Sequence, residues 1–219
     1  MNTKIHRINL GMVNCYLIEG EKWIMIDTGV RGQMTRIKRL IQRKGISLKD
    51  IGLVIITHAH MDHAGNARKI KEATGVNIAI HHLEQEWLET GLAPVPPGRT
   101  WLGKLVSTIG QHSPPVTVDP VSADIIIGDE GFPMHDYGIS GKIIHTPGHT
   151  RGSVCLCLES GEAFVGDLAM SARFMRFTPG LSIFAEDEEE LKRSLEKLLK
   201  MGIKTVYPAH GRPFPANVF

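Results

Sequence analysis

Three absences narrow what this sequence can be, and the first concerns cysteine. Only 3 of the 219 residues are cysteines, so they cannot all pair: Cys15, Cys155 and Cys157. Cys155 and Cys157 stand two apart in an apolar run, so we expect both to point the same way from one strand. A redox or metal pair would instead favour a loop and a Cys-x-x-Cys spacing. We therefore interpret all three as reduced thiols in or near the core of a cytoplasmic protein.

The chain also lacks an excess of charge and a long hydrophobic run. Lys and Arg number 25 against 23 Asp and Glu, a formal net charge of +2. This balance argues against nucleic acid or an anionic membrane as the main partner. The N-terminal stretch has no signal-peptide pattern, and no apolar run approaches the roughly 20 residues that span a bilayer. A hydrophobic content of 42% is instead typical of one large domain, residues 1–219, with a substantial core.

A dense group of possible metal ligands lies between positions 58 and 63. Its members are His58, His60, Asp62 and His63. Imidazole and carboxylate groups are both preferred ligands of Zn²⁺ and its neighbours. In a helix, His58 and His60 would point about 200° apart. In a strand, His63 would point away from the other three. The spacing therefore favours a loop that curls around one metal ion, with His63 turned towards a second.

Further motifs follow this loop in a fixed order. They are Thr146-Pro147-Gly148-His149-Thr150, Phe164-Val165-Gly166-Asp167 and Tyr207-Pro208-Ala209-His210-Gly211. Together with residues 58–63 and an early Asp27-Thr28-Gly29, they resemble the metal loops of the metallo-β-lactamase fold superfamily. The resemblance extends from about residue 14 to residue 211. Any one of the later motifs would be weak alone, but the combination is specific.

The resemblance implies a fold and a ligand set. The expected fold is α+β, a four-layer αββα sandwich of two mixed β-sheets flanked by helices. The first metal position takes His58, His60 and His149, and the second takes Asp62, His63 and His210. Asp167 bridges the two, and Asp62 and Asp167 are the expected catalytic carboxylates. The cofactors would be two divalent transition-metal ions, with zinc as the leading candidate and iron or manganese also suited to these ligands. Asp27 would support the metal loops, or would serve only as a turn or helix cap.

The chemistry that follows is metal-dependent hydrolysis. A hydroxide bridging two metal ions would attack a small ester, thioester or lactone. A bridging aspartate resembles glyoxalase II and related thioesterases and lactonases. The chain ends at Phe219, shortly after His210, so we expect the glutathione-binding domain of glyoxalase II to be absent. Two divalent ions, two carboxylates and one hydroxide leave a charge of about +1, which favours an anionic small-molecule substrate. No nucleic-acid or membrane partner is expected, and a homodimer is left open.

Three alternative functions belong to other classes than ester, thioester or lactone hydrolysis. Persulfide dioxygenases resemble this sequence in the same loops, but would use one iron held by His58, His149 and Asp167. A phosphodiesterase would use the same two ions on a phosphoryl centre. A metal-binding interaction protein without catalysis would have no reason to retain all seven ligands.

The remaining pattern predicts the elements that carry these loops. Apolar runs predict strands at 13–18, 23–26, 53–56, 76–80, 125–127, 142–144, 154–158, 163–165 and 203–207. Helical spacing predicts helices over about 34–44, 66–73, 99–109 and 186–201. His81 and His82, after the 76–80 strand, are interpreted as surface or cap histidines.

Two irregular stretches are candidates for substrate selection. Residues 91–120 are rich in proline and glycine, and could cover the metal cleft with Trp101 and Leu102 as a wall, or simply connect two halves of the fold. In the stretch 170–184, Arg173 and Arg176 alternate with aromatic residues. This alternation would suit either a cleft lining or a dimer contact.

Overall fold

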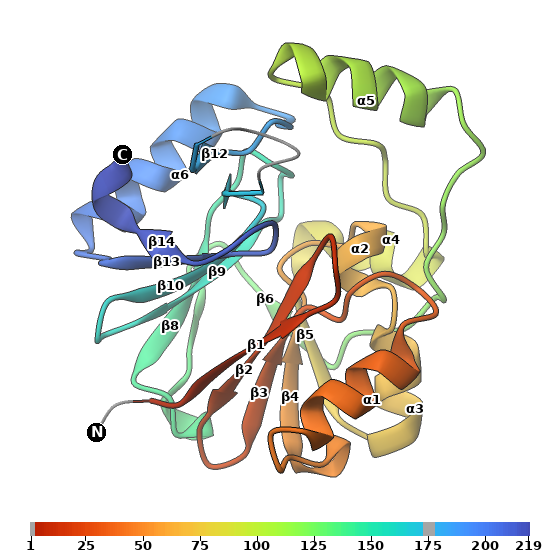
Figure 1. Cartoon of the computed structure of the whole chain (residues 1–219), viewed down its shortest axis with the longest axis vertical. Coiled ribbons are helices and arrows are strands. Elements are labelled where there is room, and N and C mark those ends of the chain that lie inside the picture. The colour runs from red at the N-terminus through yellow and green to blue at the C-terminus, as the bar shows by residue number, and fades with distance from the viewer. Residues whose placement is uncertain (1–2, 173–177) are drawn as a thin grey trace.

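The fold is centred on two six-stranded β-sheets (Figure 1). The structure is a computed structural model, and it describes residues 3–172 and 178–219. The first sheet contains, in spatial order, β1 (Ile5–Asn9), β2 (Asn14–Glu19), β3 (Trp23–Ile26), β4 (Ile51–Ile55), β5 (Asn77–His81) and β6 (Ile125–Ile127). The second contains β14 (Phe214–Pro215), β13 (Thr205–Pro208), β10 (Glu162–Gly166), β9 (Val154–Leu158), β8 (Gly141–His145) and β7 (Phe132–Pro133). A separate small sheet pairs β11 (Ala169–Met170) with β12 (Gly180–Leu181).

Both large sheets are mixed. In the first, β1, β2 and β3 pair antiparallel, whereas β3 to β6 pair parallel. In the second, only the β10–β13 pair is parallel. Each parallel pair needs a crossover, and helices supply the crossovers of the first sheet. The helices are α1 (Met34–Gln42), α2 (Met61–Ala64), α3 (Ala67–Thr74), α4 (Gln85–Thr90), α5 (Trp101–Gln111) and α6 (Glu188–Lys200).

Three apolar layers show how the sheets and helices stack. Because side chains alternate along a strand, Tyr16 and Ile18 of β2 face the second sheet and Leu17 faces the helices. The inner layer joins both sheets and includes Phe164 of β10. One outer layer packs the first sheet against α1, α3 and α4, and the other packs the second sheet against α6 and its Leu191. The predicted αββα sandwich is therefore confirmed (Figure 1).

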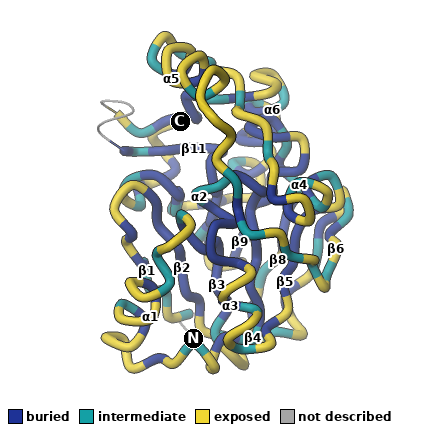
Figure 2. Tube along the Cα trace, turned by 90° about the vertical axis from the view of Figure 1, so that its right-hand side faces the viewer, coloured by how far each residue is buried: buried dark blue, intermediate teal, exposed yellow. Residues whose placement is uncertain are grey.

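The placement of the cysteines fits the sequence-based expectation. All three cysteines are free and buried, and Cys155 and Cys157 share the apolar layer beneath α6. Among the described helices, none has the length and hydrophobicity needed to cross a membrane. Figure 2 shows the strands mostly buried, whereas α5 is largely exposed. Helix α4 and the short 3₁₀ segment η2 (His82–Glu84) were not anticipated from the sequence.

Candidate metal centre

The candidate ligands follow the ends of four strands, as the sequence predicts. β4 leads into the loop that holds His58 and His60, and β8 leads to His149. β10 is followed directly by Asp167, and β13 leads to His210. The first motif is only partly a loop, since His60 is the N-cap of α2 and Asp62 and His63 lie within this short helix.

The seven predicted side chains converge. The ligand atoms of His58, His60 and His149 lie within 4.8 Å of one another, and so do those of Asp62, His63 and His210. The two triads are the same groupings that the sequence analysis expects to hold the two metal ions. Within the first triad, Nε2 of His149 lies 3.2 Å from Nδ1 of His60.

Asp167 lies between the two triads. Its Oδ1 atom is 3.3 Å from Nε2 of His210 and 3.5 Å from Nε2 of His63, in the second triad. Its Oδ2 atom is 3.7 Å from Nε2 of His149, in the first triad. A carboxylate with one oxygen towards each group has the geometry that a bridging ligand requires.

The chemistry of the set fits a pair of divalent ions. Nε2 of His58, Nε2 of His63 and Oδ1 of Asp167 are buried, and have no hydrogen-bond partner among the described residues. An unpartnered buried polar atom is costly, so three of them directed at one place require an occupant. Imidazole nitrogens and carboxylate oxygens are ligands that zinc and the neighbouring transition metals accept.

The Nδ1 atoms of His210 and His149 each lie against a backbone oxygen. Nδ1 of His210 lies 2.8 Å from the backbone oxygen of Met12, and Nδ1 of His149 lies 3.3 Å from that of Phe184. Since a carbonyl only accepts, each of these nitrogens carries the ring proton and Nε2 is left to bind a metal ion. Such outer hydrogen bonds orient metal-binding histidines. These two backbone partners could not be found from the sequence.

Asp27 supports both the loop and one of the rings. Its carboxylate accepts hydrogen bonds from the backbone N–H of Thr57 at 2.8 Å and from the Thr57 hydroxyl at 2.9 and 3.0 Å. Its Oδ2 atom also lies 2.8 Å from Nδ1 of His63. Among described residues other than glycine, Asp27 alone has a positive φ, 56°. Aspartate tolerates this left-handed conformation better than most residues, and here it turns the carboxylate back towards the loop.

Glu84 is a positioning residue that sequence reasoning missed. Its buried carboxylate accepts hydrogen bonds from the backbone N–H of Ala59 at 2.9 Å and of Gly152 at 3.2 Å. It therefore joins the loop of His58 and His60 to the loop of His149. Burial raises the pKa of Glu84 above its ordinary value, although these hydrogen bonds favour the charged form. No pattern in the sequence around Glu84 distinguishes it from an ordinary helix-cap residue.

The electrostatics differ between the two triads. Burial, reinforced by the neighbouring His149, lowers the pKa of His60 to about 3, so this ring is neutral and ready to bind a metal ion. Burial alone would also lower the pKa of His63, but Asp27, Asp62 and Asp167 together raise it to about 9. The carboxylates thus create a strongly cation-favouring position at the second triad.

A cavity of about 660 Å³ opens onto the metal centre. His60, Asp62, His149, Asp167 and His210 line its floor. Its walls come largely from the segment 91–118, including Val95, Pro96, Val106, Pro115 and Val116. The expectation that this irregular stretch covers the cleft is thus confirmed.

Trp101 does not contribute to that wall, so its predicted place was wrong. Its side chain is 78% exposed and is absent from the cavity lining. Trp101 is the first residue of α5, and the face of this helix that carries Val106 and Gly110 turns to the cavity instead. Arg173 and Arg176, the other candidates for substrate selection, lie outside the described residues.

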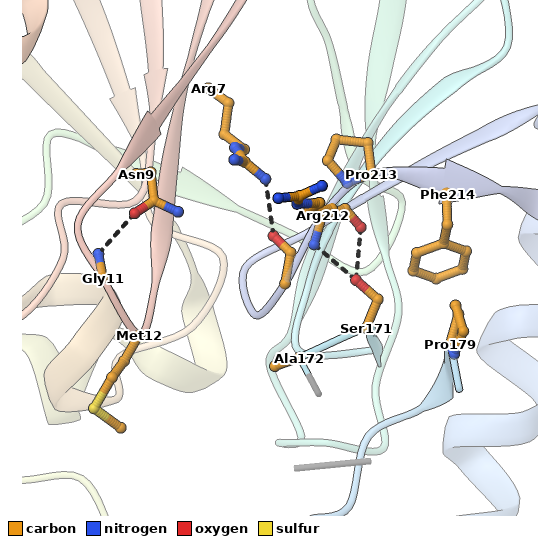
Figure 3. A pocket seen from close by; sticks show the side chains of 11 residues that line it. Arg7, Asn9, Gly11, Met12, Ser171, Ala172, Pro179, Arg212, Pro213 and Phe214 are labelled. Atoms are coloured by element: carbon orange, nitrogen blue, oxygen red, sulfur yellow. Dashed lines mark hydrogen bonds between the residues drawn. The ribbon is translucent and has the colours of Figure 1, made fainter. Parts of the chain in front are cut away.

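A second cavity, of about 730 Å³, contains none of the seven candidate ligands (Figure 3). Arg7 and Arg212 line it, and Arg7 donates to the backbone oxygen of Gly211 at 3.3 Å. The Ser171 hydroxyl bonds both the backbone oxygen and the backbone nitrogen of Arg212, at 2.6 and 2.8 Å. These contacts hold the loop that carries His210 in place. Because the larger cavity contains none of the candidate ligands, we assign the chemistry to the smaller one.

Comparison with known proteins places the chain in a family. The model of the metallo-beta-lactamase superfamily matches residues 8–210, which contain all seven candidate ligands. The chain belongs to this superfamily. A probable metallo-hydrolase of Methanocaldococcus jannaschii is 31% identical over 90% of this chain and 87% of its own length. A probable metallo-hydrolase of Bacillus subtilis is 27% identical over 98% of this chain and 86% of its own length.

A structural comparison also supports the metallo-β-lactamase fold for this chain. The crystal structure of BJP-1, a subclass B3 metallo-beta-lactamase of Bradyrhizobium japonicum, superimposes with a TM-score of 0.68. The superposition covers 95% of this chain and 75% of the BJP-1 chain, at 20% sequence identity. At that identity the likeness concerns the fold alone. Membership in the superfamily, together with the His and Asp groups, implies divalent metal ions and a metal-dependent hydrolase.

Proposed function

We propose that this protein is a binuclear metal-dependent hydrolase that cleaves a small ester, thioester or lactone. The observation that carries the proposal is the position of Asp167, with Oδ1 towards His63 and His210 and Oδ2 towards His149. A single-ion site would need no carboxylate between two complete triads.

The residues present would hold two ions and leave room for the reacting groups. His58, His60 and His149 would hold the first ion through three nitrogens, an open coordination that is typical of catalytic rather than structural sites. Asp62, His63 and His210 would hold the second. When bound, the two ions would activate a shared water molecule and polarise the substrate carbonyl.

The chain itself contributes orientation and charge. Asp167 would hold the two ions side by side, and Asp62 adds negative charge beside His210, with its Oδ2 atom 3.2 Å from Nε2 of His210. His210 and His63 hold the pKa of the Asp167 carboxyl well below its usual range, although burial acts in the opposite direction. His63 and His210 lower the pKa of the Asp62 carboxyl as well, against the effect of burial, so both carboxylates are charged at neutral pH and would bind metal ions rather than protons. These two carboxylates are the catalytic residues of the proposal.

The composition of the cavity walls indicates the chemical character of the part of the substrate that is not cleaved. The described residues that line the cavity include no Lys or Arg, and its walls above the metal centre are mainly proline and valine. Such walls suit the acyl part of a substrate, because apolar surface is removed from water on binding. An anionic group of the substrate would then lie at the metal centre itself, where the cations are.

The mononuclear-iron alternative is disfavoured by the second triad. An oxygenase that used only His58, His149 and Asp167 would leave His63 Nε2 buried without a partner. We see no observation that favours a phosphodiesterase or a non-catalytic protein. A homodimer stays a prediction.

A substrate panel tests the proposal directly. Purified protein would be assayed against acyl thioesters, acyl esters and lactones with acyl chains of increasing length, and against β-lactams and phosphodiesters. Asp167→Ala serves as the inactive control, and Asp136→Ala, at an exposed position, as the active one. We expect turnover of carbonyl substrates that depends on acyl length. Cleavage of phosphodiesters alone would overturn the carbonyl assignment. One tightly held iron with sulfur-dependent oxygen uptake would overturn the binuclear hydrolase.

A further inference from the structure

The wall of the cavity is fastened to the body of the fold along a short segment that precedes α6. Figure 1 shows α5, which belongs to the irregular stretch 91–120, at the outer end of two long connections. This stretch pairs with residues 182–188, called here the linking segment. Gly98 and Phe184 form an antiparallel bridge between the two. The linking segment therefore holds the wall against the rest of the fold.

Arg99 strengthens this pairing with its backbone and its side chain. Its backbone N–H donates to the oxygen of Ile183 at 2.7 Å, and its Nε donates to the backbone oxygen of Ser182 at 2.8 Å. Its Nη1 atom lies 3.3 Å from Oε1 of Glu188. The Arg99 side chain is only 19% exposed, so these charge-assisted contacts are largely shielded from water. Because Ser182 and Glu188 are the two ends of the linking segment, one guanidinium group spans it.

Helix α5 rests on the same segment. Gly103 is one of the buried residues of α5, and a Cβ atom at this position would collide with the backbone oxygen of Ile183. The helix therefore approaches the linking segment as closely as a residue without a side chain allows. Val106, three positions further along α5, lines the cavity. A displacement of the linking segment would thus move this part of the wall.

The linking segment also holds His149 of the first triad. The backbone oxygen of Phe184 lies 3.3 Å from Nδ1 of His149 and so orients the ring. The backbone N–H of Glu186 donates to the oxygen of His149 at 3.1 Å, and that of Asp187 donates to the oxygen of Gly148 at 3.0 Å. The segment therefore contacts both the ring and the backbone of a candidate metal ligand.

Ser182 connects the contacts of Arg99 with those of His149. Its backbone oxygen accepts the hydrogen bond from Arg99, and its hydroxyl accepts one from the backbone N–H of Phe184 at 3.2 Å. The same hydroxyl lies 3.5 Å from Nδ1 of His149. Ser182 is fully buried. Because a closely packed interior transmits strain, a shift of Ser182 at one contact would disturb the other.

We propose that Arg99 is a positioning residue for both the first metal position and the cavity wall. The inference rests on the proposed function, because it takes His149 as a ligand of the first ion. Arg99 is not one of the seven candidate ligands and is absent from the described lining of the cavity, so it would touch neither an ion nor the substrate. It would act through the linking segment, on the His149 ring through Phe184 and on the wall through α5.

The test compares three variants with the wild type. Arg99→Met keeps the apolar stem of the side chain and removes the guanidinium group. Arg99→Lys keeps the charge, but an ammonium group cannot reproduce the contacts with Ser182 and Glu188 at once. The matched control is Arg68→Met, which removes another arginine in contact with a glutamate, Glu72 at 2.8 Å, on the surface of α3.

Three measurements would be made on each protein. Competition between the protein and a chromophoric chelator for Zn²⁺ gives the affinities of the two metal positions. ¹⁵N-histidine NMR spectra record the Nδ1 signals of His149 and His210. Turnover of short-chain and long-chain acyl substrates at saturating Zn²⁺ separates KM from kcat. Circular dichroism and Tm show whether each variant is folded.

In Arg99→Met, Zn²⁺ affinity at the first position should fall about 3- to 10-fold, less than the 10- to 100-fold typical of losing a direct partner, with the second position retained. The Nδ1 signal of His149 should shift, whereas that of His210 should not. KM should rise more for long-chain than for short-chain substrates. Arg99→Lys should lie between Arg99→Met and the wild type, and Arg68→Met should match the wild type.

A lower Tm in Arg99→Met, with the first affinity and the His149 signal both unchanged, would overturn the proposal and leave Arg99 a purely structural role. Neither of these two measurements involves a substrate. A failure of the proposed hydrolase function would therefore be seen separately, as a lack of turnover of every carbonyl substrate by the wild type.

Discussion

The Nδ1 atom of His63 lies 2.8 Å from Oδ2 of Asp27, and both side chains are buried. The same carboxylate holds the backbone and the hydroxyl of Thr57. One residue therefore fixes both the path of the first metal loop and the direction of a ring in the second triad. Asp27 acts on the metal centre through these contacts and would touch neither ion.

This relationship predicts a selective effect of Asp27→Asn. An asparagine can present only one oxygen, and its amide group donates, so Thr57 and Nδ1–H of His63 can no longer both be satisfied. Loss of such an outer partner typically weakens metal affinity about 10- to 100-fold. Because the one remaining oxygen can still accept the Thr57 N–H, we expect that loss at the second metal position, where His63 lies, with the first retained. Competition with a chromophoric chelator measures both affinities. Asp136→Asn is the control, and an unchanged second affinity in Asp27→Asn would contradict the assigned role.

The bridging position of Asp167 predicts a different pattern. Asp167→Ala should lower metal occupancy at both positions, whereas His210→Ala should lower mainly the second. Both Asp167→Ala and His58→Ala should abolish hydrolysis with the secondary structure retained, because these side chains lie on loops outside the three apolar layers. Metal content, circular dichroism and turnover together check this. Full occupancy of one position in Asp167→Ala would show that Asp167 serves only one ion.

Much of the fold could be predicted from the sequence because its signals are local. The strands at β2, β3, β4 and β9 are continuous apolar runs, and α6 has a regular apolar face after an acidic N-terminal turn. Residues 58–63 stood out as a dense group of ligand types, and the resemblance of the later motifs to the superfamily added His149, Asp167 and His210. Short edge strands such as β7 and β14 contain two residues each, too few to show a period.

The parts that could not be predicted depend on contacts between distant segments. Glu84 has its role only because η2 packs against two loops that lie 25 and 68 positions away. The backbone oxygen of Met12 beside His210 belongs to no side chain and leaves no trace in the sequence. The apolar character of Trp101 suggested a wall, but α5 turns this residue to solvent. Which side of an isolated helix faces the core is decided by packing rather than by composition.

A pH dependence follows from the burial of Cys157. Burial raises the pKa of this thiol from 9.0 to about 12, with Lys197 acting weakly against the shift. Between these values the unfolded chain loses the proton and the folded protein keeps it. The unfolded state then binds fewer protons, so stability falls as pH rises through this window, by at most about 1.4 kcal/mol per pH unit for one thiol.

The measurement is the free energy of unfolding in urea between pH 8 and pH 11, for the wild type and Cys157→Ala. Other buried acids titrate in the same range, so only the difference in slope between the two proteins reports on Cys157. We expect the variant to lose less stability per pH unit above pH 9. Identical slopes would mean that the thiol ionises as easily in the folded protein as in the unfolded chain.

The last prediction separates the cavity wall from the outer face of α5. Val106 lines the cavity above the metal centre, whereas Trp101, on the same helix, is exposed and outside it. Val106→Ala removes two methyl groups from an apolar wall, worth up to about 1.6 kcal/mol when fully buried, so binding of a long acyl chain should weaken by up to about 15-fold. The change should appear in KM for long-chain substrates, with kcat and metal content unchanged, because the ligands are not touched. Trp101→Ala, the control, should leave the ranking of substrates as it is. If Trp101→Ala changes that ranking while Val106→Ala does not, the acyl part binds outside the cavity, on the exposed side of α5.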